Sequence, residues 1–537
     1  MNPPGQPANL TRMGGTGRVP RLRAFVRSYG SPFLAGLLLT SGLPPFGWWP
    51  LALVGASVMA ATMQQRTWPD RFRRASAVGL GFLGPGLFWI TEFHLVGFML
   101  GVAIETFFLA AVISLAPIAP APLRSTRAPS SPAWMLLTLP ASLVLADASR
   151  SAWPFGGTPI ALFSQTQIGG PLAQVARLGG GLAVTAMVGV VGVVGVCLAA
   201  LTTRWTGVDR PKAAGPAVAG LGAAVVIGVC LAATFAPNGR SIGDIRVSMV
   251  QGGGERGTRA VTTDSRDVVR AHVTASAKVP KGVDLVLWPE DVLENDGALD
   301  GSDMDRGMGA LARRFDAPLA AGVFEVYDRH NRNAAVAWDA KGVVTGRYEK
   351  NQRVPFGEYV PFRSLIASIV DVSAIPNDAI VGKGPAILRT SAADLGVVIC
   401  YEVFFSRRTR AAMDEGAELL YVPTNANSYT TTQMPALELG AARLRAIETG
   451  RYVLQVAPTG FSAFIDPDGD VVARTDLGAQ AVLTDQVQRR TGSTLYTRTG
   501  DGPIVVLALL IVATARLNRP RDARLGSPTP QAGRLDE

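Results

Sequence analysis

Long runs of apolar residues with few charges fill residues 30–236 and 502–515, whereas residues 237–501 alternate charged and apolar positions. An apolar run of about 20 residues is long enough to cross a bilayer as a helix. The alternating part has the pattern of a globular domain in contact with water. The pattern therefore predicts a helical membrane bundle, a soluble domain and one final membrane helix.

The first apolar part divides into seven candidate membrane spans. The first two flank residues 42–50, where prolines break a helix and tryptophans suit a membrane interface, so they are either separate spans or one interrupted element. The seven candidates cover residues 31–43, 47–64, 75–92, 95–118, 134–150, 178–202 and 214–235.

Basic residues gather before the first span and in the loops after the second, fourth and sixth spans, so these segments all lie on one side of the membrane. Segments rich in Lys and Arg remain in the cytoplasm. Seven crossings then place the soluble domain outside the cytoplasm. The predicted order is a basic cytoplasmic tail (1–29), a seven-span bundle (30–236), an extracytoplasmic domain (237–501), a final span (502–517) and a cytoplasmic tail (518–537). The basic residues are Arg12, Arg18, Arg21, Arg23, Arg27, Arg66, Arg71, Arg73, Arg74, Arg124, Arg127, Arg204, Arg210, Lys212, Arg516, Arg519, Arg521 and Arg524.

The composition supports a membrane location and excludes a nucleic-acid partner. Of the 537 residues, 48% are hydrophobic and 17% charged, which is too apolar for a soluble protein of this size. The net charge of +10 comes from residues beside apolar segments and in the tails, without the interleaved aromatics of a nucleic-acid surface. We interpret these charges as topology signals.

The soluble domain alternates short β-rich runs with helical stretches, which is an α/β pattern. Lys341-Gly342 and Asp468-Gly469 each lie between strand-like runs and predict hairpin turns. The predicted strands cover residues 246–250, 283–288, 317–323, 395–399, 419–422 and 453–456, and the predicted helices lie near residues 264–279, 303–314, 405–416 and 434–450.

Cys400 is the one cysteine of the soluble domain, because Cys197 and Cys230 fall inside predicted spans. It ends an apolar strand and is followed by a turn toward a helix that begins near Phe405. Such a junction presents a nucleophile at a sheet edge, beside backbone N–H groups that stabilise an oxyanion. A buried core cysteine is the alternative interpretation.

Two further residues have the chemistry that a cysteine nucleophile needs. Glu290 follows an apolar strand and Pro289, and a carboxylate beside a thiol is a candidate base, although strand-end glutamates are often solvated. Lys350 lies in a segment rich in proline and aromatic residues, residues 347–361. It would supply a fixed positive charge to a thiolate and an oxyanion, with a solvated lysine as the alternative.

The order of these motifs resembles that of the nitrilase superfamily, and their position after a set of membrane spans resembles the apolipoprotein N-acyltransferases, the membrane-spanning branch of that superfamily. The similarity extends over nearly the whole chain. The motifs are Trp288-Pro289-Glu290, Tyr348-Glu349-Lys350, Val354-Pro355-Phe356-Gly357-Glu358 and Cys400-Tyr401-Glu402.

The resemblance implies a polytopic α-helical membrane bundle of about eight helices with an extracytoplasmic α/β nitrilase-like domain, an αββα sandwich. It implies that Glu290 is the general base, Lys350 the oxyanion-stabilising residue and Cys400 the nucleophile that becomes a thioester. Four residues match supporting positions of the family: Glu358, Tyr401, Glu402 and Asn425.

The implied activity is transfer of an acyl chain from a membrane phospholipid to the α-amino group of a diacylglyceryl apolipoprotein, in a bacterial cell membrane. A membrane-anchored carbon–nitrogen hydrolase (amidase) is a second enzyme hypothesis. A membrane scaffold with a glycosyltransferase partner is a third hypothesis, from a different class.

The sequence departs from the family pattern at three places. Residues 291–294 replace small residues and a proline with Asp-Val-Leu-Glu, residues 424–429 lack a tryptophan, and no tryptophan lies between Gln251 and Leu287. These differences concern lipid and acceptor preference.

Other features add smaller expectations. His94, His272 and His330 lack metal-ligand spacing, so no metal is expected, and no cofactor either. Glu92 and Glu105 lie in apolar surroundings and are candidates for a function, because carboxylates within a membrane are costly. Four aromatic residues are candidates for guarding substrate access: Trp48, Trp49, Phe356 and Tyr359. For the two tryptophans, a place in the aromatic belt of the membrane interface is the alternative.

Overall fold

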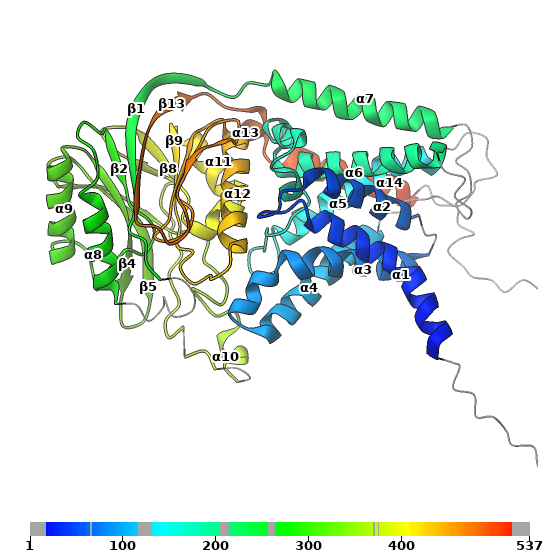
Figure 1. Ribbon diagram of the computed structural model, residues 1–537, viewed down its shortest axis with the longest axis horizontal. Coiled ribbons are helices and arrows are strands. Elements are labelled where there is room, and N and C mark those ends of the chain that lie inside the picture. Colours follow the sequence, from blue (N-terminus) through cyan, green and yellow to red (C-terminus); the bar gives the residue numbers. More distant parts are fainter. Residues whose placement is uncertain are drawn as a thin grey trace, which may run out of the picture.

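A computed structural model describes residues 18–64, 67–115, 131–202, 214–255, 264–368, 371–373 and 375–517. A helical body and a body of sheets and helices lie side by side in it (Figure 1). The two bodies correspond to the two apolar parts and to the alternating part of the sequence.

The helical body contains one helix at each of the eight predicted spans. The first two candidates correspond to two separate helices, and their assignment as two spans stays a prediction. The third candidate ends earlier than predicted, because α3 stops at Pro85 and Gly86 and is followed by a short 3-10 helix, η1 (Phe88–Glu92). The helices are α1 (Arg18–Thr40), α2 (Trp49–Thr62), α3 (Trp68–Gly86), α4 (Leu95–Leu115), α5 (Ser131–Arg150), α6 (Ala176–Thr202), α7 (Ala214–Thr234) and α14 (Gly502–Leu517).

Within the described residues, three helical segments are long and apolar enough to cross a membrane: Leu95–Leu115, Pro171–Leu201 and Gly215–Thr234. Two further helices, α2 and α14, are apolar but shorter. The count of eight crossings therefore stays a prediction. Residues 1–17 of the predicted N-terminal tail, the whole predicted C-terminal tail and most of the basic residues used to orient the bundle lie outside the described residues, while residues 18–29 belong to α1.

The second body contains two sheets. The first has the order β13-β1-β2-β4-β5-β6, with β3 beside β4, and the second has the order β12-β11-β10-β9-β8-β7. The strands are β1 (Arg240–Gln251), β2 (Leu285–Leu287), β3 (Leu293–Asp296), β4 (Leu319–Val326), β5 (Asn331–Trp338), β6 (Val344–Glu349), β7 (Ile387–Arg389), β8 (Asp394–Val397), β9 (Leu419–Pro423), β10 (Val453–Val456), β11 (Ala463–Ile465), β12 (Val471–Arg474) and β13 (Ala481–Thr491).

Four helices cover the outer faces of the two sheets. Helices α8 (Ser265–Ser276) and α9 (Asp303–Phe315) lie on the first sheet, and α11 (Ser406–Asp414) and α12 (Gln433–Thr449) lie on the second (Figure 1). The layers are therefore helix, sheet, sheet, helix, as the α/β pattern and the resemblance predicted. Both predicted hairpins are present, between β5 and β6 and between β11 and β12.

The alternation of side chains along β2 explains how the first sheet is covered on both faces. Leu285 and Leu287 belong to the core between the two sheets, whereas Val286 and Trp288 pack in the core beneath α8 and α9. Successive side chains of a strand point to opposite faces, so an unbroken apolar run is required where both faces are buried.

Helix α12 joins the second sheet to the helical body. Nearly all of its residues are buried, and Leu437 and Ile447 belong to one apolar cluster with Phe82 of α3 and Leu139 of α5. A helix that is buried on all sides has neighbours on all sides. The face of the second sheet that α12 covers is therefore turned toward the bundle.

Candidate active site

Glu290 projects from the end of β2 into the interior. Pro289 ends the strand, and the glutamate is only 2% exposed. Its Oε1 accepts hydrogen bonds of 2.8 Å from Lys350 Nζ and from Asn333 Nδ2. Its Oε2 is buried and has no hydrogen-bond partner within the described part of the chain. One carboxylate oxygen is thus held in place while the other stays open to accept a proton.

Lys350 follows β6 and bridges two carboxylates. Its Nζ also donates a hydrogen bond of 2.7 Å to Glu358 Oε1. Burial alone would lower the pKa of this ammonium, but the charges of Glu290 and Glu358 raise the pKa well above the ordinary value. Lys350 is therefore a permanent cation at neutral pH, and Glu358 fixes its position.

Cys400 begins a 3-10 turn, η5 (Cys400–Phe404), three residues after the end of β8. Its φ of +51° lies in the left-handed region, which costs a non-glycine residue about 1 kcal/mol or more and is frequent at active sites. Burial raises the pKa of the thiol well above its ordinary value, with help from the charges of Glu290 and Glu438, while Lys350 opposes the rise. The resting group is a thiol that needs a base.

Glu402 ties the turn of Cys400 to the segment that follows Lys350. Its Oε2 accepts hydrogen bonds from Tyr348 Oη and from the N–H of Ile399, both at 2.7 Å. Its Oε1 accepts from two N–H groups of the Lys350 segment, at 2.7 and 2.9 Å, those of Asn351 and Gln352. The buried carboxyl group of Glu402 thereby holds the Cys400 turn next to the Lys350 segment. The sequence alone does not show this connection.

Tyr401 and Asn425 complete the surroundings of the thiol. The Oη of Tyr401 donates a hydrogen bond of 2.9 Å to the carbonyl oxygen of Gly157, in the loop that connects α5 to α6. The backbone N–H of Asn425 interacts with the Cys400 sulfur, and its Nδ2 lies 3.5 Å from Asp291 Oδ2. All seven predicted site residues therefore lie in one connected cluster at the junction with the bundle.

Glu438 also belongs to this cluster, although the sequence analysis did not single it out. Cys400 Sγ donates to Glu438 Oε1 at 3.5 Å, from the second turn of α12. A signal was available, because Glu438 is the one charged residue within the apolar run of residues 434–442. Asn333, which bridges Glu290 and Glu358, was missed as well and carries no distinctive pattern.

Two family models match the chain in sequence order. The N-terminal domain of apolipoprotein N-acyltransferase matches residues 35–194, and the carbon-nitrogen hydrolase family matches residues 246–496. The chain belongs to the apolipoprotein N-acyltransferase family.

Curated relatives of the same name extend over nearly the full chain. The apolipoprotein N-acyltransferase of Mycolicibacterium smegmatis is 29% identical, with 96% of this chain and 89% of that one covered. That of Methylococcus capsulatus is also 29% identical, with 91% and 95% covered. A solved structure of an amidase from Nesterenkonia sp. AN1 covers 48% of this chain and 98% of its own at 19% identity, with a TM-score of 0.36.

Asp291, which follows Glu290, adds a further carboxyl group to the site. Its φ is +55°, and its Oδ1 is buried without a partner among the described residues. Burial raises the pKa of Asp291 well above the ordinary value, and the charge of Glu290 adds to the rise. Five carboxyl groups, those of Glu290, Asp291, Glu358, Glu402 and Glu438, thus lie around one lysine and one thiol.

The two predicted carboxylates of the bundle have structural partners. Glu105 Oε2 accepts from Arg150 Nε at 2.5 Å, and both side chains are buried. Glu92 accepts from the backbone N–H and the hydroxyl groups of Thr430 and Thr431, in the segment between Asn425 and α12. The ion pair of Glu105 therefore joins α4 to α5. The hydrogen bonds of Glu92 join η1 to residues 430 and 431 of the segment that precedes α12.

The predicted access aromatics differ in their surroundings. Trp48 and Phe356 are 57% and 53% exposed, and the Phe356 ring meets that of Phe155 edge to face at 5.9 Å. Tyr359 lies beneath the guanidinium of Arg353, 4.1 Å from the ring centre. Trp49 packs against Gly170. A role in substrate access stays a prediction for all four.

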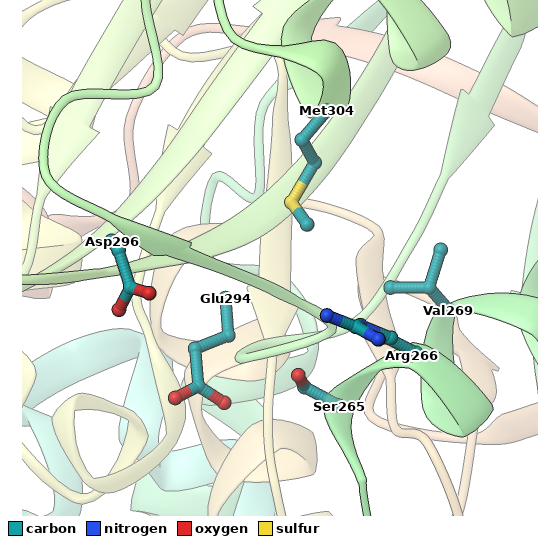
Figure 2. Close-up of a pocket in the computed structure, with 6 residues that line it drawn as sticks. All are labelled: Ser265, Arg266, Val269, Glu294, Asp296 and Met304. Carbon is teal, nitrogen blue, oxygen red and sulfur yellow. The ribbon is translucent and has the colours of Figure 1, made fainter.

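No group of three or more metal-binding side chains occurs in the part of the chain that the structure describes. A depression of about 320 Å³ lies beside the first sheet, and Figure 2 shows the six residues that line it. It is lined by residues of α8, β3 and α9, and none of the site residues contributes. The six residues that line the depression are Ser265, Arg266, Val269, Glu294, Asp296 and Met304.

Proposed function

We propose that the chain transfers a fatty acyl group from a membrane phospholipid to the α-amino group of the N-terminal diacylglyceryl-cysteine of apolipoproteins, through a thioester on Cys400. The observation that supports this best is the arrangement of Lys350 between Glu290 and Glu358, beside the Cys400 thiol, on the side of the domain that contacts the bundle. Both substrates are amphiphiles, and that side is where a membrane would deliver them.

In the first half-reaction Glu290 accepts the thiol proton through its unpartnered Oε2. The sulfur attacks the ester carbonyl carbon, and the oxyanion is held by Lys350 and by the N–H of Tyr401, at the beginning of a helical turn where N–H groups lack intrahelical partners. The carbon–oxygen bond breaks, and Glu290 returns the proton to the leaving lysophospholipid. The acyl chain remains on the sulfur.

In the second half-reaction the free α-amino group attacks the thioester carbonyl. A carbon–nitrogen bond forms and the carbon–sulfur bond breaks. Glu290 moves one proton from nitrogen to sulfur, so the thiol is restored. Two successive half-reactions on one nucleophile constitute ping-pong catalysis.

The side of the membrane is part of the proposal. Seven crossings before the domain, with basic loops in the cytoplasm, place residues 237–501 on the extracytoplasmic side of a bacterial cell membrane. Donor and acceptor would then reach Cys400 from the outer leaflet.

A membrane-anchored amidase is the second candidate, because the carbon-nitrogen hydrolase model matches residues 246–496. It would use the same cluster with water as acceptor. The scaffold hypothesis has less support, since neither matching family model describes a glycosyltransferase.

The test is a two-step assay with purified protein in detergent. Incubation with a phospholipid that carries a labelled acyl chain should give a labelled, hydroxylamine-sensitive adduct, and mass spectrometry should locate it on Cys400. Subsequent addition of a diacylated lipopeptide should move the label to that peptide. Cys400→Ser is the matched control, because Cys197 and Cys230 remain. A label that is released as free fatty acid at the same rate with and without lipopeptide would contradict the transferase.

A further inference from the structure

In the second half-reaction the acceptor nitrogen loses two protons, and Glu290 accounts for one of them. An α-amino group has an ordinary pKa of about 8, so the acceptor arrives largely as an ammonium ion. It must lose one proton before it attacks and a second one as the amide forms. Glu290 carries the second proton to sulfur, and a separate base is needed for the first.

Two carboxyl groups flank the Cys400 sulfur from different elements. Glu290 follows β2, and Glu438 projects from α12, with its Oε1 3.5 Å from Sγ. Glu438 is 2% exposed, and its Oε2 is buried without a hydrogen bond of ordinary geometry in the described residues, although the Thr424 hydroxyl faces the carboxyl group. No cation forms an ion pair with it among the described side chains.

The same helix offers a comparison. Glu448 is as deeply buried, but its Oε1 accepts from Arg445 at 3.0 Å and from the N–H of Gly181 at 2.9 Å. Glu448 therefore joins α12 to α6 as a structural group. A buried carboxyl without such partners reduces stability, and groups of this kind concentrate at functional sites.

Acylation of Cys400 changes what Glu438 contacts. The resting thiol donates its proton toward Glu438 Oε1, but a thioester sulfur carries no proton. Glu438 loses that donor in the one state of the enzyme in which the amine arrives. Its carboxylate is then free to accept a hydrogen bond from the incoming ammonium beside the acyl carbon.

We propose that Glu438 is a second general base of the site, which removes the first proton of the acceptor's α-ammonium group before the amine attacks the thioester. This proposal rests on the proposed acyl transfer. The ammonium N–H bond breaks, the carboxylate becomes a carboxylic acid, and the proton passes to water before the next turnover. Glu290 keeps its role in forming the thioester.

The charges around Glu438 fit this task. The groups that face it are Glu290, Lys350, Cys400 and Tyr429. Burial raises the pKa of Glu438 to about 7, and the charge of Glu290 contributes to the rise. A base with a pKa near that of its proton donor transfers protons efficiently in both directions.

The test separates the two half-reactions in Glu438→Gln. Acyl-thioester formation from labelled phospholipid should stay within about 3-fold of wild type, and it also reports that the variant is folded. Transfer to a diacylated lipopeptide at pH 7 should fall by about 10²-fold. The loss should shrink as the pH rises toward 9, because the amine then loses its proton to water.

Hydroxylamine gives an independent measurement, since it is largely a free base at neutral pH. The acylated Glu438→Gln variant should react with it as fast as acylated wild type. Glu448→Gln is the matched control and should leave the ratio of the two half-reaction rates unchanged. Equal losses in both half-reactions, or an unchanged rate to lipopeptide at pH 7, would overturn the proposal. Absence of a thioester in wild type would instead overturn the proposed function.

Discussion

The Oη of Tyr401 and the carbonyl oxygen of Gly157 are 2.9 Å apart, and this hydrogen bond links the residue after the proposed nucleophile to the loop between α5 and α6. Position 157 requires a glycine, because its φ is +105° and an added Cβ would lie 2.1 Å from the Ser151 carbonyl oxygen. This hydrogen bond therefore fixes the position of the α5–α6 loop relative to the residue next to Cys400.

Tyr401→Phe should retain the packing of the ring and lose this hydrogen bond, which contributes about 1 kcal/mol. We expect slower thioester formation, by roughly 5- to 10-fold, with a melting temperature within a few degrees of wild type. Rates of adduct formation with labelled phospholipid measure the effect. An unchanged rate would mean that the Gly157 contact does not position Cys400.

Lys350→Met should abolish thioester formation and lower stability. It leaves Glu290 and Glu358 buried beside each other without their cation, and removing one partner of a buried ion pair costs about 3–5 kcal/mol. Without the cation both carboxyl groups would bind protons more tightly in the folded state than in the unfolded state. The variant should therefore regain stability as the pH is lowered below neutral.

Melting temperatures between pH 5 and 8 check this expectation, and Glu358→Gln in the Lys350→Met background is the control. The double variant removes one of the two carboxylates and should be more stable than Lys350→Met at pH 7. A single variant that melts at the wild-type temperature across this range would contradict the role of Lys350 in holding the two carboxylates.

Glu402→Gln should disturb the site through backbone positions. Glu402 accepts four hydrogen bonds, and a glutamine offers one acceptor oxygen and an NH₂ group that would face other donors. We expect loss of thioester formation and faster hydrogen exchange at Asn351 and Gln352. Tyr348→Phe is the graded control, because it removes one of the four bonds and should retain most of the activity.

How much of this site was predictable depends on where each residue lies along its element. Glu290, Lys350 and Cys400 follow strands, and strand ends of a sheet gather at an edge, so pattern and motif together indicated them. Glu438 reaches the sulfur from a helix 38 residues further along the chain, through the packing of α12 between sheet and bundle. No local sequence pattern encodes that packing.

The bundle was predictable as a set of apolar segments, but its polar contacts were not. Glu105 and Arg150 both stand out as charges in apolar runs, yet their pairing requires α4 and α5 to be neighbours. Asp291 was visible as a departure from the family pattern. Its burial beside Glu290 depends on the left-handed turn at the end of β2, which the sequence does not show.

Asp291→Asn tests whether this additional carboxyl is neutral. Burial raises the pKa of Asp291 well above the ordinary value of 3.8, so the group should be protonated at neutral pH, and an uncharged amide of similar shape should preserve transfer at pH 7 within about 3-fold. In the unfolded chain the group ionises near its ordinary pKa, while the folded chain keeps the proton to higher pH. Wild type should therefore lose stability relative to Asp291→Asn as the pH rises above about 4. The difference between the melting temperatures of the two proteins, measured from pH 4 to 8, checks this. A difference that stays constant over this range would show that Asp291 is ionised in the folded protein.

Glu92→Gln should loosen the segment between Asn425 and α12. The Glu92 carboxylate accepts from the N–H and hydroxyl groups of Thr430 and Thr431, and the Tyr429 ring lies edge to face with that of Phe93 at 5.2 Å. A neutral amide is a weaker acceptor than a carboxylate, because hydrogen bonds to charged groups contribute about 1.5–3 kcal/mol. Amide hydrogen exchange at Thr430 and Thr431 should accelerate roughly 10-fold. Exchange in β9 should stay unchanged, since that strand is fully buried in the second sheet. Equal rates at both threonines in variant and wild type would mean that aromatic packing, rather than Glu92, holds this segment against the bundle.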